Sequence, residues 1–312
     1  MEDLANAESP APARFRFRDI WRGPDGLRAG WALLAFYLFC AGVIALIGYL
    51  AYVLHHPFRR SSTITPGIMI LVTGMQCCAV LIATLAMSRI ERRSWLDYGL
   101  RASRPLLQLG QGAFWGIAAI SAMMGLLALT HGAQIEFSGA SARSLLESGL
   151  LWAVVFALVG FNEELTFRGY AFFRLTLGTR PLVAAVVLSL LFGGVHLTNH
   201  GETVIGILQA AAFGLVACLA IWRTGSLWWA IGLHAAWDWG QTFLFGTADS
   251  GLAAQGQLLI SHATGPVWLS GGTVGPEASV LAFPVMAMVA LIAVKTLPRV
   301  ETPLATLGRP AA

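Results

Sequence analysis

Long apolar stretches alternate with short polar segments along most of the chain. A helix that crosses a bilayer needs about 20 mostly apolar residues. Seven stretches have that character throughout, and an eighth begins near Gly149 and turns abruptly polar after Phe161. The predicted spans are 31–54, 65–87, 109–130, the stretch from 149 onward, 181–198, 203–222, 226–246 and 278–297. The pattern shows neither strand alternation nor an internal repeat, so we expect an all-α, polytopic transmembrane helical bundle of about eight spans.

Composition supports a membrane protein and excludes several other classes. Of the 312 residues, 56% are hydrophobic and only 12% are charged, whereas about a quarter of the residues in soluble proteins are charged. So few charges exclude an ordinary soluble enzyme and a disordered chain. The net charge of +4 comes from Arg clusters in tails and short loops, so we expect the lipid bilayer, and no nucleic acid, as a partner. The four cysteines lie in apolar stretches without metal-ligand spacing, which indicates packed thiols.

The distribution of basic residues predicts the orientation in the membrane. With eight spans, seventeen of the 20 Lys and Arg residues fall on one side, and only Arg59, Arg60 and Arg143 fall on the other. Cytoplasmic loops carry the excess of positive charge, so both termini are expected in the cytoplasm. The basic N-terminal segment lacks a short apolar core with a cleavage site, which indicates a retained tail. We expect a multi-pass protein of the bacterial inner (plasma) membrane.

The same pattern divides the chain into six expected segments. They are a basic cytoplasmic tail (1–30), three N-terminal transmembrane helices (31–130), a core that carries polar residues (145–246), an external loop (247–277), a last transmembrane helix (278–297) and a C-terminal tail (298–312). The 247–277 loop has no Lys or Arg and is rich in Gly and Ser. Such a composition favours irregular backbone, so we expect little regular structure there.

Ionisable side chains within apolar spans are costly and usually functional. Most acidic residues lie in tails and loops, but five ionisable residues lie within or at the end of apolar spans: Glu163, Glu164, His196, His234 and Asp238. Any one of them alone fits a buried polar group that stabilises helix packing. Five such residues on three spans are harder to explain in that way. They predict one intramembrane cavity lined by carboxylates and imidazoles.

Helical spacing predicts different surroundings for the two adjacent glutamates. Glu164 and Arg168 are four residues apart, so they can pair on one face of a helix. Glu163 is rotated by about 100° and is left to face another direction. His234 and Asp238 are also four residues apart, which presents an imidazole and a carboxylate side by side.

The motifs Glu-Glu-x-x-x-Arg, Phe-x-x-x-His and His-x-x-x-Asn/Asp follow one another on successive spans of this chain. In that order they resemble the CPBP family of intramembrane proteases, which includes CAAX prenyl endopeptidases and bacteriocin-processing or immunity proteins. The resemblance covers roughly residues 145–245, and the remaining spans are supported by hydropathy only. Asp238 stands where many members have Asn, which leaves open whether this side chain donates or accepts a hydrogen bond.

The resemblance implies an intramembrane endopeptidase that hydrolyses a peptide bond of a membrane-embedded or lipidated substrate. Glu163 would activate the attacking water, and His196 would help to polarise it. His234 and Asp238 would stabilise the oxyanion or complete the site. Chemically, hydrolysis needs a base and a donor facing the developing oxyanion, and these residues can supply both.

The resemblance leaves the supporting residues and a metal less closely defined. Glu164 and Arg168 would be structural or would orient the substrate. Glu163, His196 and His234 form a His₂Glu set, which is common at catalytic Zn²⁺. No His-Glu-x-x-His helix is present, and both a metalloprotease and a metal-free glutamate mechanism are considered for the family. We favour a divalent metal here but assign no ligand.

Two other functions fit parts of the sequence. One is a non-enzymatic membrane protein, such as an immunity or scaffold factor, although all motif positions are intact. The other is a proton-coupled transporter, because membrane carboxylates and histidines also form proton relays. Transporters often contain inverted repeats, and none is detected here. The sequence does not identify the substrate, which could be a CAAX-type prenyl protein or a processed bacteriocin-like peptide.

Overall fold

The computed structural model describes residues 17–23, 26–53 and 65–300. Its helices are α1 (Ala29–Val53), α2 (Pro66–Ile90), α3 (Pro105–Leu129), α4 (Ala142–Arg168), α5 (Tyr170–Gly178), α6 (Pro181–Val195), α7 (Val204–Thr224), α8 (Trp228–Trp239), α9 (Val267–Ser270) and α10 (Ala282–Thr296). Its strands are β1 (Arg22–Gly23), β2 (Gly26–Leu27), β3 (Ala133–Phe137) and β4 (Leu259–Ala263). Most of the N-terminal tail, the segment with Arg59 and Arg60 and the end of the C-terminal tail lie outside the described residues.

The helices confirm the predicted all-α membrane bundle. Within the described residues, six helical segments are long and apolar enough to cross a bilayer: α1, α2, α3, α4 continued by α5, α6 with the turn that follows it, and α7. The remaining two predicted spans are shorter helices. α10 has 15 residues, and the 12 residues of α8 continue into a π-helical turn at Gly240–Leu244.

Local sequence signals set where several helices begin. α2, α3 and α6 each start with proline, whose missing N–H is not needed in the first helical turn. The Ser141 hydroxyl accepts the Ser144 N–H and caps α4. This helix therefore begins before the predicted apolar stretch at Gly149, and it continues through the polar end of that stretch to Arg168. The site residues at 163–168 thus occupy its last two turns.

α8 is held at the centre of the bundle by close contacts with α3 and α4. A Cβ added to Gly112 of α3 would lie 2.0 Å from the Trp229 carbonyl oxygen, and one on Gly232 of α8 would lie 2.1 Å from the Leu109 carbonyl oxygen. At Gly160 of α4 a Cβ would lie 3.0 Å from the backbone of α8. Such glycines let the helix backbones approach closely, as in other membrane bundles. The motif on α8 is thereby placed against the motif on α4.

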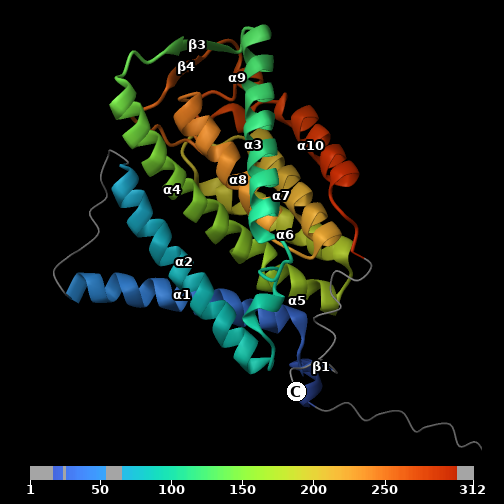
Figure 1. Cartoon of the computed structure of the whole chain (residues 1–312). Coiled ribbons are helices and arrows are strands. Elements are labelled where there is room, and N and C mark those ends of the chain that lie inside the picture. Colours follow the sequence, from blue (N-terminus) through green and yellow to red (C-terminus); the bar gives the residue numbers. More distant parts are fainter. Residues whose placement is uncertain (1–16, 24–25, 54–64, 301–312) are drawn as a thin grey trace, which may run out of the picture.

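The N-terminal helices lie beside this bundle. Figure 1 shows α1 at a large angle to α2, with both on the side of α4 that faces away from α10. Only 6% of the most apolar stretch of α1 is buried, which leaves most of the helix to face lipid. α2 packs along α4 and contributes Met69 and Thr73 to the pocket described below.

The 247–277 segment is more ordered than its composition predicts. It contains β4, the short helix α9 and the beginning of a 3₁₀ turn at Pro276–Ala278. β4 pairs antiparallel with β3, with Ala133 opposite Ala263 and Phe137 opposite Leu259. The expectation of little regular structure is therefore wrong, because the α3–α4 connection supplies a strand partner that local composition does not reveal. This sheet lies across one end of the bundle (Figure 1).

Candidate active site

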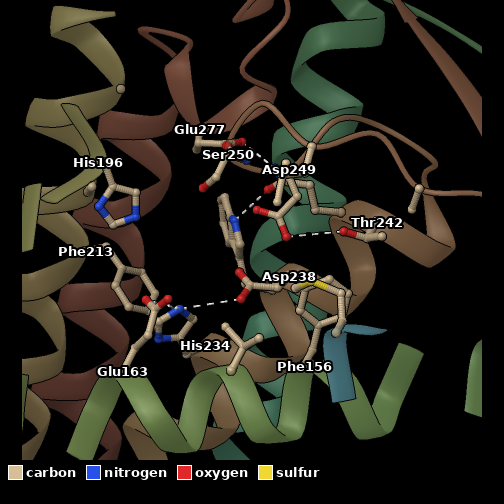
Figure 2. Close-up of a pocket in the computed structure, with 18 of the residues that line it drawn as sticks. Phe156, Glu163, His196, Phe213, His234, Asp238, Thr242, Asp249, Ser250 and Glu277 are labelled. Atoms are coloured by element: carbon tan, nitrogen blue, oxygen red, sulfur yellow. Dashed lines mark hydrogen bonds and ion pairs between the residues drawn. The ribbon is translucent and has the colours of Figure 1, made fainter. Parts of the chain in front are cut away.

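A pocket of about 200 Å³ lies between α2, α4, α6, α7, α8 and the 247–277 segment. It is lined by all four residues that the sequence analysis assigns to catalysis: Glu163, His196, His234 and Asp238. Glu163 belongs to α4, His196 follows α6, and His234 and Asp238 belong to α8; Figure 2 shows that these four side chains point into the same space. The prediction of one cavity lined by carboxylates and imidazoles is therefore confirmed in its geometry.

Glu164 and Arg168 form the predicted pair beneath this pocket. The Arg168 Nη1 lies 3.2 Å from the Glu164 Oε1, and both side chains are fully buried. The same Glu164 oxygen accepts a hydrogen bond from His234 Nδ1 at 2.8 Å. Because a carboxylate only accepts, Nδ1 carries the proton in this contact. The pair therefore orients the imidazole of α8, a contact that sequence spacing alone did not indicate.

Glu163 is directed away from this pair, as predicted from its position one residue earlier. Its side chain is 31% exposed, whereas that of Glu164 has no exposed surface. Its Oε2 lies 3.6 Å from His234 Nε2, on the other side of the ring from Glu164. The two adjacent glutamates thus contact opposite nitrogens of one imidazole, and only Glu163 lines the pocket.

Asp238 extends the line of polar groups one turn further along α8. Its Oδ2 lies 3.5 Å from His234 Nε2, and only 9% of the residue is exposed. Figure 2 shows this carboxylate between His234 and the residues of the 247–277 segment. Nε2 of His234 is therefore close to both Glu163 and Asp238, which confirms the predicted side-by-side arrangement on α8.

His196 lies just beyond the end of α6 and enters the pocket from another side. Its Nδ1 lies 2.7 Å from the Phe192 carbonyl oxygen. A carbonyl only accepts, so Nδ1 carries the proton, and Nε2 of the neutral ring has a free lone pair. Phe192 also packs edge-on against His196, with 4.8 Å between ring centroids, and the Arg168 guanidinium lies 4.1 Å over the Phe192 ring. The ion pair beneath the pocket thus supports His196 through Phe192.

Two acidic residues that the sequence analysis missed close the opposite side of the pocket. Asp249 accepts a hydrogen bond from the Thr242 hydroxyl at 3.2 Å. Glu277 accepts the Ser250 N–H at 2.6 Å and a hydrogen bond from the Gln241 amide. Both line the pocket. Their only signal in the sequence is that they are carboxylates in a segment without Lys or Arg to neutralise them.

Burial changes the acidity of these two carboxyl groups. It raises the pKa of Asp249 to about 7, and the nearby Glu163 carboxylate adds to the rise while the Thr242 hydroxyl opposes it. Burial also raises the pKa of Glu277 well above its usual range, and the negative charge of Asp249 adds to this effect. A large share of Asp249 and most of Glu277 therefore carry a proton near neutral pH, and in that form they can donate as well as accept hydrogen bonds.

The predicted metal requires three side chains that converge on one point. Within the described ranges, no group of three or more His, Cys, Asp or Glu side chains is arranged to hold a metal ion. Glu163 and His234 face each other, but His196 does not complete a ligand set with them in this conformation. The three residues therefore do not fit a bound metal in this arrangement.

The fold and the site define a class of protein: a polytopic helical membrane protein with an acid- and imidazole-lined pocket among its helices. Residues 145–240 match the family described as type II CAAX prenyl endopeptidase Rce1-like. This match includes the three motifs and supports the CPBP and CAAX protease family assignment for this part of the chain, as the resemblance indicated. It covers less than a third of the chain. Neither the curated proteins nor the solved structures provide a match.

Proposed function

We propose that the protein is an intramembrane endopeptidase in which Glu163 activates water for attack on a peptide bond. The observation that carries this proposal is the contrast between the two adjacent glutamates. Glu164 is fully buried, is paired with Arg168 and orients His234, whereas Glu163 is partly exposed and lines the pocket. A general base must be able to reach its water, and Glu163 meets that condition while Glu164 does not.

His196 supports the attack from the other side of the water. Its Nδ1–H donates to the Phe192 carbonyl, so Nε2 is available to accept a hydrogen bond from the attacking water. Glu163 takes the proton as the water oxygen bonds to the carbonyl carbon. The carbonyl π electrons move to oxygen and form the tetrahedral oxyanion.

Collapse of this intermediate completes the reaction. The oxyanion re-forms the carbonyl as the bond to nitrogen breaks, and protonated Glu163 returns its proton to the leaving amine. His234 lies next to Glu163, and when both of its nitrogens carry protons Nε2 can donate to the oxyanion. Protonated Asp238, one helical turn away, can donate in the same way.

The walls of the pocket support an apolar, membrane-bound substrate. Aromatic side chains from three helices line it together with the catalytic groups: Trp152, Phe156, Phe213 and Trp237. Such surfaces bind apolar groups, while the carboxylates and imidazoles mark the reacting end. The family description names prenyl endopeptidases, so we propose a prenylated protein or peptide that reaches the site through the bilayer.

The basic residues support an orientation in which both termini lie on the cytoplasmic side of a bacterial inner membrane. Arg89 is in the last turn of α2, Arg101 lies between α2 and α3, and Arg223 is in the last turn of α7. Figure 1 shows the end of α2 and the beginning of α3 at the end of the bundle away from β3 and β4, and the positive-inside rule favours the cytoplasm for that end. The pocket then lies nearer the external side, because Asp249 and Glu277 belong to the external segment.

A cleavage assay with the full chain tests this function. The protein is reconstituted in phosphatidylcholine vesicles with a farnesylated peptide that ends in a CAAX box, and released tripeptide is measured by mass spectrometry. His196→Ala is the control, because removing this imidazole leaves the Glu164–Arg168–His234 contacts intact. We expect release by the parent and a loss of roughly 100-fold or more in the control. Absence of release, or equal release by both, would contradict the proposal.

The same assay measures metal dependence. A metal-free glutamate mechanism predicts that exhaustive treatment with phenanthroline leaves turnover unchanged. A catalytic Zn²⁺ held by Glu163, His196 and His234 predicts loss of turnover, recovery with added zinc and about one metal per chain. The second result would show that the three side chains rearrange from the positions described above to form a ligand set.

A further inference from the structure

Gln209 lines the pocket from α7, and its carboxamide takes no part in the steps described above. Only 4% of the residue is exposed. Within the part of the chain that the structure describes, no hydrogen bond reaches its amide nitrogen or its oxygen. Native proteins pair nearly all buried polar groups, because an unpaired amide costs stability. An unpaired amide that faces a pocket therefore indicates a partner that is not part of the protein.

The helix register places Gln209 beside the catalytic groups. Phe213 of α7 packs against the His234 ring of α8, with 4.9 Å between ring centroids. Gln209 lies one turn before Phe213, and Asp238 lies one turn after His234. Because α7 and α8 are joined by the short turn at 225–227, they run in opposite directions. One turn back along α7 and one turn forward along α8 therefore lead in the same direction. Gln209 thus lies at about the level of Asp238.

Acidic side chains make up much of the polar surface of this pocket. Five carboxyl groups line it: Glu163, Glu202, Asp238, Asp249 and Glu277. In their ionised form they only accept hydrogen bonds, so an amide N–H on the wall adds a donor that does not depend on pH. A peptide that enters loses water from its carbonyl oxygens, and each of those oxygens then needs a donor.

Several donors on the pocket wall are already used within the protein. The Gln241 amide donates to the Ala248 carbonyl and to Glu277. The Trp237 indole donates to the Gln241 oxygen at 2.9 Å, and the Thr242 hydroxyl donates to Asp249. The amide of Gln209 has no such partner among the described residues, so its two N–H groups are available to an occupant of the pocket.

We infer that Gln209 is a positioning residue that donates a hydrogen bond to a main-chain carbonyl oxygen of the substrate, close to the bond that is cleaved. This inference rests on the proposed endopeptidase function and adds a specific residue to it. A main-chain contact of this kind holds the scissile carbonyl in line with the water on Glu163 without selecting a particular side chain. The amide oxygen of Gln209 is left to accept from a substrate N–H, as in the pairing of two peptide groups.

Gln241 provides a matched control for this inference. It is also a buried glutamine on the pocket wall, with no exposed surface. Its amide, unlike that of Gln209, is hydrogen-bonded within the protein on both sides. Methionine has nearly the same size and shape as glutamine but no amide. Gln241→Met should therefore lower the unfolding temperature, whereas Gln209→Met should leave it unchanged or raise it, because it removes an unpaired buried amide.

Substrate binding provides the second measurement. The probe is a dansylated, farnesylated CAAX peptide in phosphatidylcholine vesicles, and its affinity is measured in the Glu163→Gln background so that no turnover is needed. Gln209→Met should weaken binding by roughly 5- to 30-fold, as expected for the loss of one hydrogen bond. Replacing one peptide oxygen by sulfur, a poorer acceptor, should weaken binding to the Gln209 protein at a single position. The same replacement should have no further effect in Gln209→Met, because the contact is already absent.

The outcomes separate the inference from the function on which it rests. A fall in the unfolding temperature of Gln209→Met similar to that of Gln241→Met would show a structural role and overturn the inference. Sulfur effects that are the same in both proteins at every position would also overturn it. If neither protein binds the farnesylated peptide, the proposed function itself fails and the inference fails with it.

Discussion

Among the described residues, two buried ion-pair clusters lie in the bundle, one where α2 meets α5 and one where α4 meets α8. In the first, Glu91 accepts hydrogen bonds from Tyr98 at 2.9 Å and from Tyr170 at 2.7 Å. Its Oε1 also lies 2.9 Å from the Arg174 Nε. Both carboxylate oxygens are thus paired, and none of these residues lines the main pocket. This cluster joins the ends of two helices and leaves the carboxylate no capacity for chemistry.

The second cluster also contains a glutamate paired with an arginine, but the groups around that pair are different. Glu164 Oε1 accepts from both Arg168 and His234, and the other oxygen of Glu164 has no partner within the described residues. The imidazole that it holds is in contact with Glu163, which lines the pocket. The comparison shows that a buried ion pair alone does not mark a site. What marks this one is that the pair holds a titratable ring against a second, accessible carboxylate.

Glu164→Gln is expected to produce the largest loss of stability. The substitution leaves the fully buried Arg168 without its counter-charge, which typically costs about 3–5 kcal/mol in the free energy of unfolding. Activity should fall as well, because His234 loses the carboxylate that orients it. Thermal unfolding in detergent and turnover in vesicles measure the two effects. An unchanged unfolding temperature would place Glu164 in the chemistry and remove the distinction between the two glutamates.

Glu91→Gln should reduce stability alone. Glutamine keeps one acceptor oxygen for the tyrosines but loses the charge paired with Arg174, so we expect a loss of roughly 1–3 kcal/mol. Turnover per folded molecule should equal that of the parent, because the cluster lies outside the pocket. A selective fall in turnover at full stability would mean that the cluster at the end of α2 also acts on the site.

Asp249→Asn should change the pH dependence of stability. Because the pKa of Asp249 is raised to about 7 from an ordinary value of 3.8, the folded protein holds this proton more tightly than the unfolded chain. The free energy of unfolding therefore falls as pH rises from about 4 to about 7. Asparagine does not titrate, so the Asp249→Asn variant lacks this contribution. Neighbouring acids also bind part of the proton, so the slope of the free energy of unfolding against pH should flatten by only a fraction of the ~1.4 kcal/mol per pH unit that one full proton produces.

Unfolding temperatures at several pH values between 4 and 8 check this expectation. Glu136→Gln is a suitable control, because Glu136 is an exposed carboxylate on β3 away from the pocket. An Asp249→Asn variant with the same slope as the parent would contradict the raised pKa of Asp249.

Much of the fold could be predicted from the sequence, because in a membrane the length of each apolar stretch dictates a helix. Motif spacing also predicted the Glu164–Arg168 pair and the separate direction of Glu163, since both follow from helical geometry. The start of α4 was placed too late. Its first turns carry polar residues, and only the Ser141 cap indicates where the helix begins.

The wall of the pocket that the 247–277 segment forms could not be predicted in the same way. Asp249 and Glu277 reach the pocket because the 247–277 segment is held across the bundle by contacts between residues distant in sequence. The Trp152 indole donates to the Gln255 carbonyl, 103 residues away, and β4 pairs with β3. Gln209 was missed because its significance lies in the hydrogen bonds that it does not make. Neither the contacts between distant segments nor the absence of a hydrogen-bond partner can be predicted from the spacing of residues along the chain.

The most direct test of the mechanism measures turnover and unfolding for Glu163→Gln in a single preparation. The amide keeps the size of the side chain but cannot take a proton from water. We predict a loss of turnover of roughly 10²- to 10⁴-fold, with an unfolding temperature equal to that of the parent, because Glu163 is partly exposed and has no partner such as Arg168. Near-normal turnover, or a loss that follows from unfolding, would contradict the assignment of Glu163 as the general base.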